Sequence, residues 1–107
     1  MTWNIHISDD AEQDLLEIER YIANVLLEPM IAEKQVDRIM DAIESLDQFP
    51  LRYRVYDYEP WRTMGLRVLT VDNYVALYLP DEETTTVTVV HVMYGGRDIE
   101  AQLNQAE

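Results

Sequence analysis

The spacing of hydrophobic residues changes once in the first half of the chain, near residue 8. Apolar and polar residues alternate over residues 3–7, which predicts a short strand with one apolar face. After Ser8, whose hydroxyl suits a helix N-cap, apolar residues recur every three or four positions in two stretches that end before Phe49. Because proline is accepted in a first helical turn but not inside a helix, residues 27–29 are predicted to form a tight corner. This pattern indicates a strand followed by an antiparallel helical hairpin.

After Pro50 the spacing shortens to the alternation of a sheet. Three strands are predicted, at residues 66–71, 74–79 and 85–94, joined by turns at 72–73 and 80–83. Two glycines follow, and Asp98 is a candidate cap for a short terminal helix that holds Ile99 and Leu103. The order β-α-α-β-β-β(-α) predicts a single α+β domain over residues 1–107. In this fold an antiparallel meander carries the two-helix hairpin on one face.

The composition is that of a soluble globular protein, with 48% hydrophobic and 27% charged residues. The absence of cysteine excludes a disulfide framework, a thiolate metal site and a cysteine nucleophile. Two distant histidines, one lysine and three glycines leave no metal cluster, P-loop or dinucleotide fingerprint, so no metal or other cofactor is expected. The N-terminus lacks a basic signal region, and the apolar runs are too short to span a membrane. The protein is therefore expected in the cytoplasm.

Charge is high and unevenly distributed along the chain. The 21 acidic and 8 basic residues give a formal net charge of −13. Residues 1–50 hold 12 acidic and 3 basic side chains, whereas residues 52–67 hold four arginines against Asp57 and Glu59. The predicted helices are therefore acidic, and the start of the sheet is locally basic. Because an acidic field repels phosphates, direct sequence-specific binding of nucleic acid is not expected.

Three segments of the second half carry a resemblance to a known family: GLRVLTV at 65–71, NYVALY at 73–78 and VVHVMYGGRD at 89–98. They resemble the RelE/ParE toxins of bacterial type II toxin–antitoxin systems, which include plasmid stabilisation proteins. The start ISDDAEQDL at 7–15 is similar to the first strand and helix of that family. The resemblance covers roughly residues 3–103 and implies a small cytoplasmic protein that inhibits growth and is neutralised by a cognate antitoxin.

The resemblance implies one of two mechanisms. One branch of the family cleaves mRNA on the ribosome, and the other poisons DNA gyrase without enzymatic activity. In the RelE-like branch lysines and arginines on and after the strands do much of the catalytic work. Arg67 and Arg97 occupy two such positions, and His91 or Tyr94 would transfer protons, but Leu69 and Val75 stand where further basic residues belong.

Net charge favours the gyrase branch slightly, because proteins that dock on ribosomal RNA are normally basic. Two alternatives stay open, namely a ribosome-dependent endoribonuclease and a degenerate, non-toxic binding module of the same fold. His91 is predicted to share a strand face with Val87, Val89 and Met93, and a histidine there is more often a hydrogen-bonded core or half-buried residue than a catalyst. Whether the chain is an enzyme therefore depends on the branch.

A partner-binding segment is predicted before the meander, where aromatic residues alternate with arginine. Arg54, Tyr56, Trp61 and Arg62 suit the core of a protein interface. The alternative is that the aromatic residues simply cover the edge of the sheet. Against so acidic a chain we expect an antitoxin segment rich in Lys or Arg, or one whose contacts are confined to residues 52–67.

Overall fold

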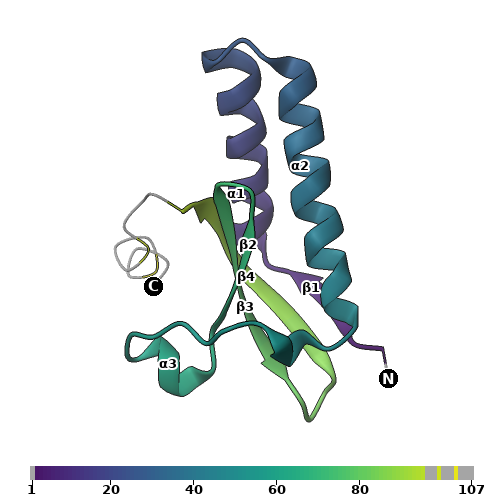
Figure 1. The fold of residues 1–107 in the computed structure, drawn as a ribbon, viewed down its shortest axis with the longest axis vertical. Coiled ribbons are helices and arrows are strands. Elements are labelled where there is room, and N and C mark those ends of the chain that lie inside the picture. The colour runs from purple at the N-terminus through teal and green to yellow at the C-terminus, as the bar shows by residue number, and fades with distance from the viewer. Residues whose placement is uncertain (1, 96–98, 100–102, 104–107) are drawn as a thin grey trace.

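The computed structural model describes residues 2–95, 99 and 103, and it has the expected α+β fold (Figure 1). The helices are α1 (Asp9–Arg20), α2 (Pro29–Glu44) and α3 (Trp61–Met64), and the strands are β1 (Asn4–Ile7), β2 (Arg67–Val71), β3 (Tyr74–Asp81) and β4 (Thr86–Tyr94). A π-helical segment at Tyr21–Val25 extends α1, and 3-10 turns lie at Ser45–Asp47 and Pro50–Arg52. The predicted strand, hairpin and meander are therefore confirmed.

Local capping explains how the hairpin begins and turns. The hydroxyl of Ser8 accepts the backbone N–H of Ala11, and three acidic side chains occupy the first turn of α1. Leu27 has a left-handed backbone with φ of 58°, and Pro29 is the first residue of α2. The predicted corner at residues 27–29 is confirmed.

The four strands form one mixed sheet in the order β1-β4-β3-β2. The pairs β2–β3 and β3–β4 are antiparallel, as the meander requires. β1 pairs in parallel with β4, from Asn4 opposite Thr86 to Ile7 opposite Val89. This pairing was not predicted, because it joins the two ends of the chain and leaves no local signal.

The turn predicted at residues 80–83 is wrong in its first half. β3 continues through Pro80, which pairs with Val87, and ends at Asp81. β2 runs beside β3 only as far as Tyr78, so Pro80 lies where β3 has an open side. Proline is accepted in strands at such positions because no ladder hydrogen bond is lost there.

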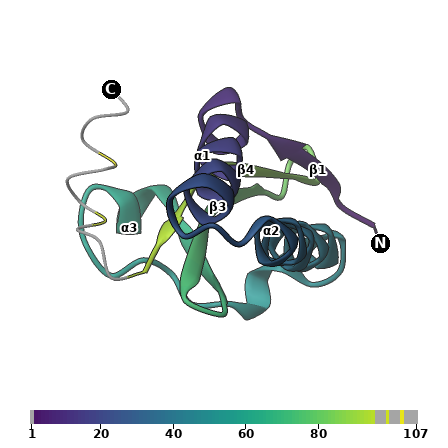
Figure 2. The ribbon, with the colours of Figure 1, turned by 90° about the horizontal axis from the view of Figure 1, so that it is seen from above.

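The sheet has a core on each face. The larger core lies against the hairpin and contains Ala11, Leu15, Ile39, Ile43, Leu46, Leu69, Ala76, Tyr78, Val87, Val89 and Val92. The smaller one contains Tyr56, Leu66, Val68, Val75, Leu77, Met93 and Leu103. Figure 2 shows α3 and α2 on opposite sides of the strands. The segment between the hairpin and the meander therefore covers a whole face of the sheet.

The predicted terminal helix is described at two positions only. Ile99 and Leu103 are both helical, and Leu103 is buried in the smaller core. Its proposed cap, Asp98, lies outside the described residues. No helix within the described ranges is long and apolar enough to cross a membrane.

Candidate functional site

A groove of about 750 Å³ separates the hairpin from the end of the sheet where β3 starts and β4 finishes. We call it the hairpin groove. It is lined by Asp14, Glu17, Ile18, Tyr21, Ile22, Leu26, Ile31, Gln35, Asn73, Tyr74, Val92, Met93 and Tyr94. Most of these side chains are apolar or aromatic, which is the usual lining of a site that receives another molecule.

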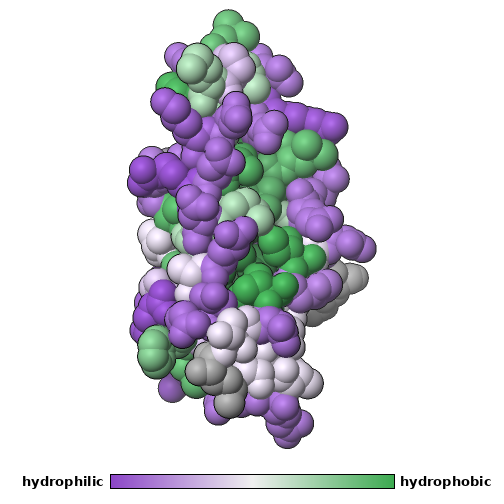
Figure 3. All heavy atoms as spheres, turned by 90° about the vertical axis from the view of Figure 1, so that its right-hand side faces the viewer, coloured by the Kyte–Doolittle hydropathy of each residue, from purple (hydrophilic) through white to green (hydrophobic). Residues whose placement is uncertain are grey.

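The groove exists because the hairpin extends past the sheet. Beyond Ile22 the apolar stripe of α1 and its π-helical extension has no strand to cover it, and the turn projects freely (Figure 1). Five apolar residues there are more than half exposed: Val25, Leu26, Leu27, Met30 and Ile31, which we call the hairpin tip. In Figure 3 apolar atoms lie at the top of the molecule, where the two helices turn. Contiguous exposed apolar surface of this kind marks an interaction site.

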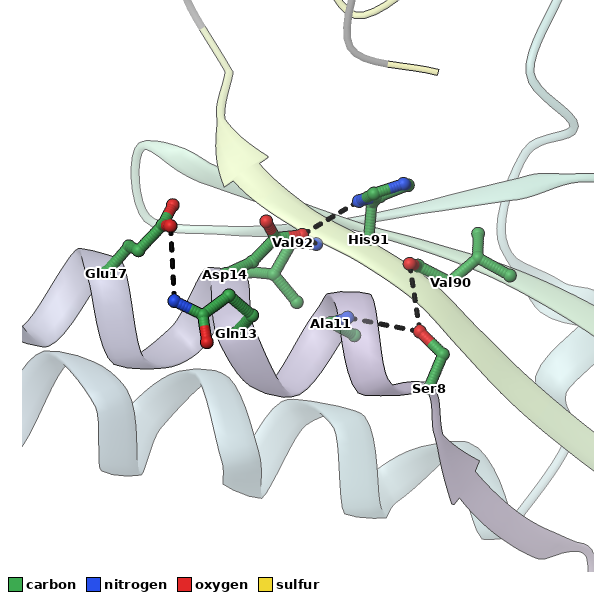
Figure 4. A network of polar contacts seen from close by, with 8 residues as sticks. All are labelled: Ser8, Ala11, Gln13, Asp14, Glu17, Val90, His91 and Val92. Atoms are coloured by element: carbon green, nitrogen blue, oxygen red, sulfur yellow. Dashed lines mark hydrogen bonds and ion pairs between the residues drawn. The ribbon is translucent and has the colours of Figure 1, made fainter. Parts of the chain in front are cut away.

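Asp14 holds α1 against the outer edge of β4 (Figure 4). Because β1 accompanies β4 only to Val89, the edge beyond that residue has no strand beside it. Oδ2 of Asp14 accepts the backbone N–H of Val92 at 3.0 Å and lies 2.9 Å from Nδ1 of His91. The hydroxyl of Ser8 donates to the Val90 carbonyl at 3.0 Å. The first turns of α1 thus replace the missing strand, a contact that the sequence pattern did not predict.

The prediction for the face that His91 occupies is wrong in part. The β3–β4 register shifts between Leu77 and Tyr78, so that His91 lies opposite Leu77 while Val89 lies opposite Tyr78. This irregularity moves His91 to the face of the smaller core, which it shares with Met93 but not with Val87 or Val89. The side chain is largely buried, and Asp14 engages its Nδ1.

Arg67 lies at the far end of the sheet, on the face that carries the hairpin. Its Nη1 contacts the carbonyls of Leu51 at 3.1 Å and Tyr53 at 2.5 Å. Its buried Nε finds no hydrogen-bond partner among the described residues. The guanidinium therefore fastens residues 50–54 to the sheet.

Tyr94 lies in the hairpin groove, with its ring edge-on to Tyr74 at 5.8 Å. Arg67 pairs with Tyr78 and Tyr94 with Tyr74, so four strand positions, roughly 13 Å, separate them along β3. His91 faces the other side of the sheet. Arg97 lies outside the described residues. The described part of the predicted ribonuclease set is therefore not gathered around one point.

The predicted partner-binding residues divide into exposed and covered side chains. Arg54 and Arg62 are exposed, whereas Tyr56 is 6% exposed and belongs to the smaller core. Trp61 is partly buried, with its ring 5.8 Å from that of Tyr56. Of the four predicted residues only the two arginines are exposed, and the neighbouring Tyr58 is 58% exposed, so partner binding here stays a prediction.

Acidic and phenolic groups set the electrostatics of the groove. Asp14 and Glu17 line it one helical turn apart, and none of the described residues that line it is Lys, Arg or His. Burial raises the pKa of Tyr74, and the neighbouring Tyr94 and Tyr21 raise it further. The groove therefore presents carboxylates and neutral phenols around an apolar floor.

A second polar anchor supports the opposite wall of the groove. Both Nε and Nη2 of Arg38 bond the carboxylate of Asp72 at 2.8 Å, and Gln35 donates to the same carboxylate at 3.1 Å. These hydrogen bonds, that of Arg38 foremost, lower the pKa of Asp72. They tie the β2–β3 turn to α2. Over the described residues no three His, Cys, Asp or Glu side chains gather as a metal cluster would need.

The sequence matches a known family over residues 5–99, described as "ParE toxin of type II toxin-antitoxin system, parDE". A comparison with curated proteins found no match. Solved structures share the fold. A chain of the chromosomal ParDE system from P. aeruginosa has a TM-score of 0.72 at 20% identity, over 87% of this chain and 96% of that one.

Other solved structures share the architecture with lower TM-scores. The RelBE2 complex from Mycobacterium tuberculosis gives a TM-score of 0.62 at 23% identity, over 88% of this chain and 99% of that one. A mutant of the E. coli toxin RelE in the free state gives a TM-score of 0.63 at 10% identity, over 98% of this chain and 93% of that one. Since the family profile spans most of the sequence, this chain belongs to the ParE toxin family of type II toxin–antitoxin systems.

Proposed function

We propose that this chain is a cytoplasmic growth-inhibiting toxin that acts on DNA gyrase and is neutralised by a cognate antitoxin. The separation of Arg67, His91 and Tyr94 supports a non-enzymatic mechanism. Cleavage of RNA by 2′-hydroxyl attack needs an acid, a base and cations within reach of a single phosphate. Here Arg67 and Tyr94 lie at opposite ends of the meander, and His91 is on the other face.

Net charge supports the same assignment. At −13 the protein repels ribosomal RNA at long range, and Arg67, one of its eight basic residues, is engaged with backbone carbonyls. A protein target avoids this repulsion, and exposed Arg54 and Arg62 are candidate contacts to it. A RelE-like endoribonuclease is the alternative that the same experiment tests.

The hairpin groove is the surface that we assign to the antitoxin. Its apolar floor continues into the exposed hairpin tip, and covering both removes apolar surface from water. Among solved structures of similar fold, RelBE2 is named as a toxin–antitoxin complex and an archaeal structure as a RelE–RelB complex. We place the antitoxin there because this groove combines a cavity with exposed apolar side chains at its end.

The test is to induce this chain alone in bacteria and follow labelled thymidine and labelled methionine uptake over the first minutes. Thymidine incorporation should fall first, and gyrase supercoiling in vitro should be inhibited. His91→Gln and Tyr94→Phe should remain toxic, since neither residue is needed for a non-enzymatic contact. Arg54→Ala combined with Arg62→Ala should lose toxicity while keeping the circular dichroism spectrum of the parent.

Two results would contradict the proposal. If methionine incorporation falls first, and this fall is no longer seen with His91→Gln or with Tyr94→Phe, the chain acts on translation as an endoribonuclease. If both labels are incorporated normally while soluble protein accumulates, the chain is a non-toxic binding module.

A further inference from the structure

The hairpin groove has a charge pattern as well as an apolar floor, and the two together describe its occupant. On the α1 side, Ile18, Ile22 and Leu26 succeed one another at four-residue intervals and form one ridge about 12 Å long. Ile31 of α2 faces the same space. A ridge of this length matches about two to three turns of a docked helix.

The acidic side chains lie beside that ridge. Asp14 and Glu17 are on the same helix and line the same groove. Oδ1 of Asp14 has no partner among the described residues, and Glu17 is exposed with a single contact to Gln13 at 3.2 Å. Because no basic residue lines the groove within the described part of the chain, these carboxylates are available to cations of a bound molecule.

Two other occupants fit less well. A strand added to the outer edge of β4 would need the N–H of Val92, which Asp14 already accepts. A second copy of this chain would bring another net charge of −13 against the acidic groove. A helix with basic side chains avoids both difficulties.

Resting on the proposed function, we infer that the antitoxin segment which fills the hairpin groove is a basic amphipathic helix. Its apolar face covers Ile22, Leu26 and Ile31, and its Lys or Arg side chains reach Glu17 and Asp14. The exposed arginines of residues 52–67 are then left to the toxin's target.

A library of helices displayed on yeast tests this inference without fixing the net charge of the helix in advance. Each member has an apolar stripe of about three turns, and its polar positions vary among Lys, Arg, Glu, Asp, Gln and Ser. The purified full chain is the bait. Enriched sequences should be net basic, and a synthetic peptide of the best sequence should bind in a fluorescence anisotropy titration that weakens as salt is raised.

Matched variants separate docking in the groove from general attraction between opposite charges. Leu26→Asp and Ile31→Asp both make the protein more acidic, so non-specific binding of a basic peptide would be kept or strengthened. Docking in the groove predicts that either variant weakens binding at least about tenfold, because an apolar contact is replaced by a carboxylate. Circular dichroism confirms that each variant is folded.

A second pair tests the charge itself. Glu17→Gln removes one negative charge inside the groove, and Glu82→Gln removes one from the distant β3–β4 turn. The first should weaken binding about two- to fivefold, as expected for an exposed ion pair, and the second should leave it unchanged. Asp14 is left intact because it also holds α1 to β4.

The inference is overturned if enriched helices are acidic or neutral, if none is enriched, or if binding survives Leu26→Asp and Ile31→Asp. None of these outcomes bears on the proposed action on gyrase, because toxicity is measured separately by thymidine and methionine uptake. Conversely, a non-toxic chain that still selects basic helices in the groove would refute the function and keep the docking chemistry.

Discussion

Asp14 joins α1 to the edge of β4, and its replacement tests whether this contact holds the groove wall in place. In Asp14→Ala the N–H of Val92 and the Nδ1 of His91 both lose their acceptor. An unpaired, partly buried N–H costs about 1–3 kcal/mol, and the contact with His91, whose side chain is 12% exposed, adds about 0.5–1 kcal/mol. We expect the free energy of unfolding to fall by about 2 kcal/mol, which lowers Tm by about 8 °C at this chain length.

Urea denaturation followed by circular dichroism at pH 7 measures this loss. Asp14→Asn keeps an oxygen acceptor in place and should cost about 1 kcal/mol or less. Glu19→Ala, on the exposed surface of the same helix, is the control and should change stability by less than about 0.5 kcal/mol.

A double-mutant cycle with His91→Ala divides the effect between the two partners. The coupling between Asp14 and His91 should be about 0.5–1 kcal/mol, and Asp14→Ala should still cost about 1 kcal/mol when His91 is absent. The reasoning is refuted if Asp14→Ala matches the Glu19→Ala control, or if Asp14→Asn is as unstable as Asp14→Ala.

Two further predictions concern the backbone and the core. Leu27 has φ of 58° just after the end of the first helix, so Leu27→Gly should raise stability by about 0.5–1 kcal/mol in thermal melting, and a lower Tm would contradict the strain argument. Burial raises the pKa of Tyr78 to about 12, above the value of about 10 for an unfolded chain. The stability that the neutral Tyr78 side chain contributes to the folded state is therefore intact below pH 10 and lost as pH rises toward 12. Tyr78→Phe should lower the free energy of unfolding by about 1 kcal/mol at neutral pH, because the hydrogen bond to the Pro50 carbonyl is lost. In urea titrations from pH 9 to 11, the free energy of unfolding of this variant should fall less steeply than that of the parent. Equal slopes would refute the pKa argument.

The candidate site was only partly predictable from the sequence. Arg67 and His91 were identified as chemically able side chains, but the backbone carbonyls that hold Arg67 and the carboxylate that engages His91 come from other parts of the chain. The aromatic residues before the meander were assigned to an interface or to the sheet edge, and Tyr56 lies in a core. Residue type indicates which chemistry a side chain can perform, whereas its burial and its hydrogen-bond partners decide whether that side chain is available for it.

By itself the sequence determined the element order, the cap at Ser8, the corner before Pro29 and the apolar faces of the hairpin and meander. Each of these depends on spacing and backbone preferences within a few residues, which a linear pattern records. Tertiary structure alone decided the parallel pairing of β1 with β4, the irregularity that turns His91 to the other face, and the contact of Asp14 with the edge of β4. The strand pairing and the Asp14 contact join residues more than seventy positions apart, and the irregularity depends on how β3 and β4 align across the sheet. The hairpin groove exists only after these contacts have formed.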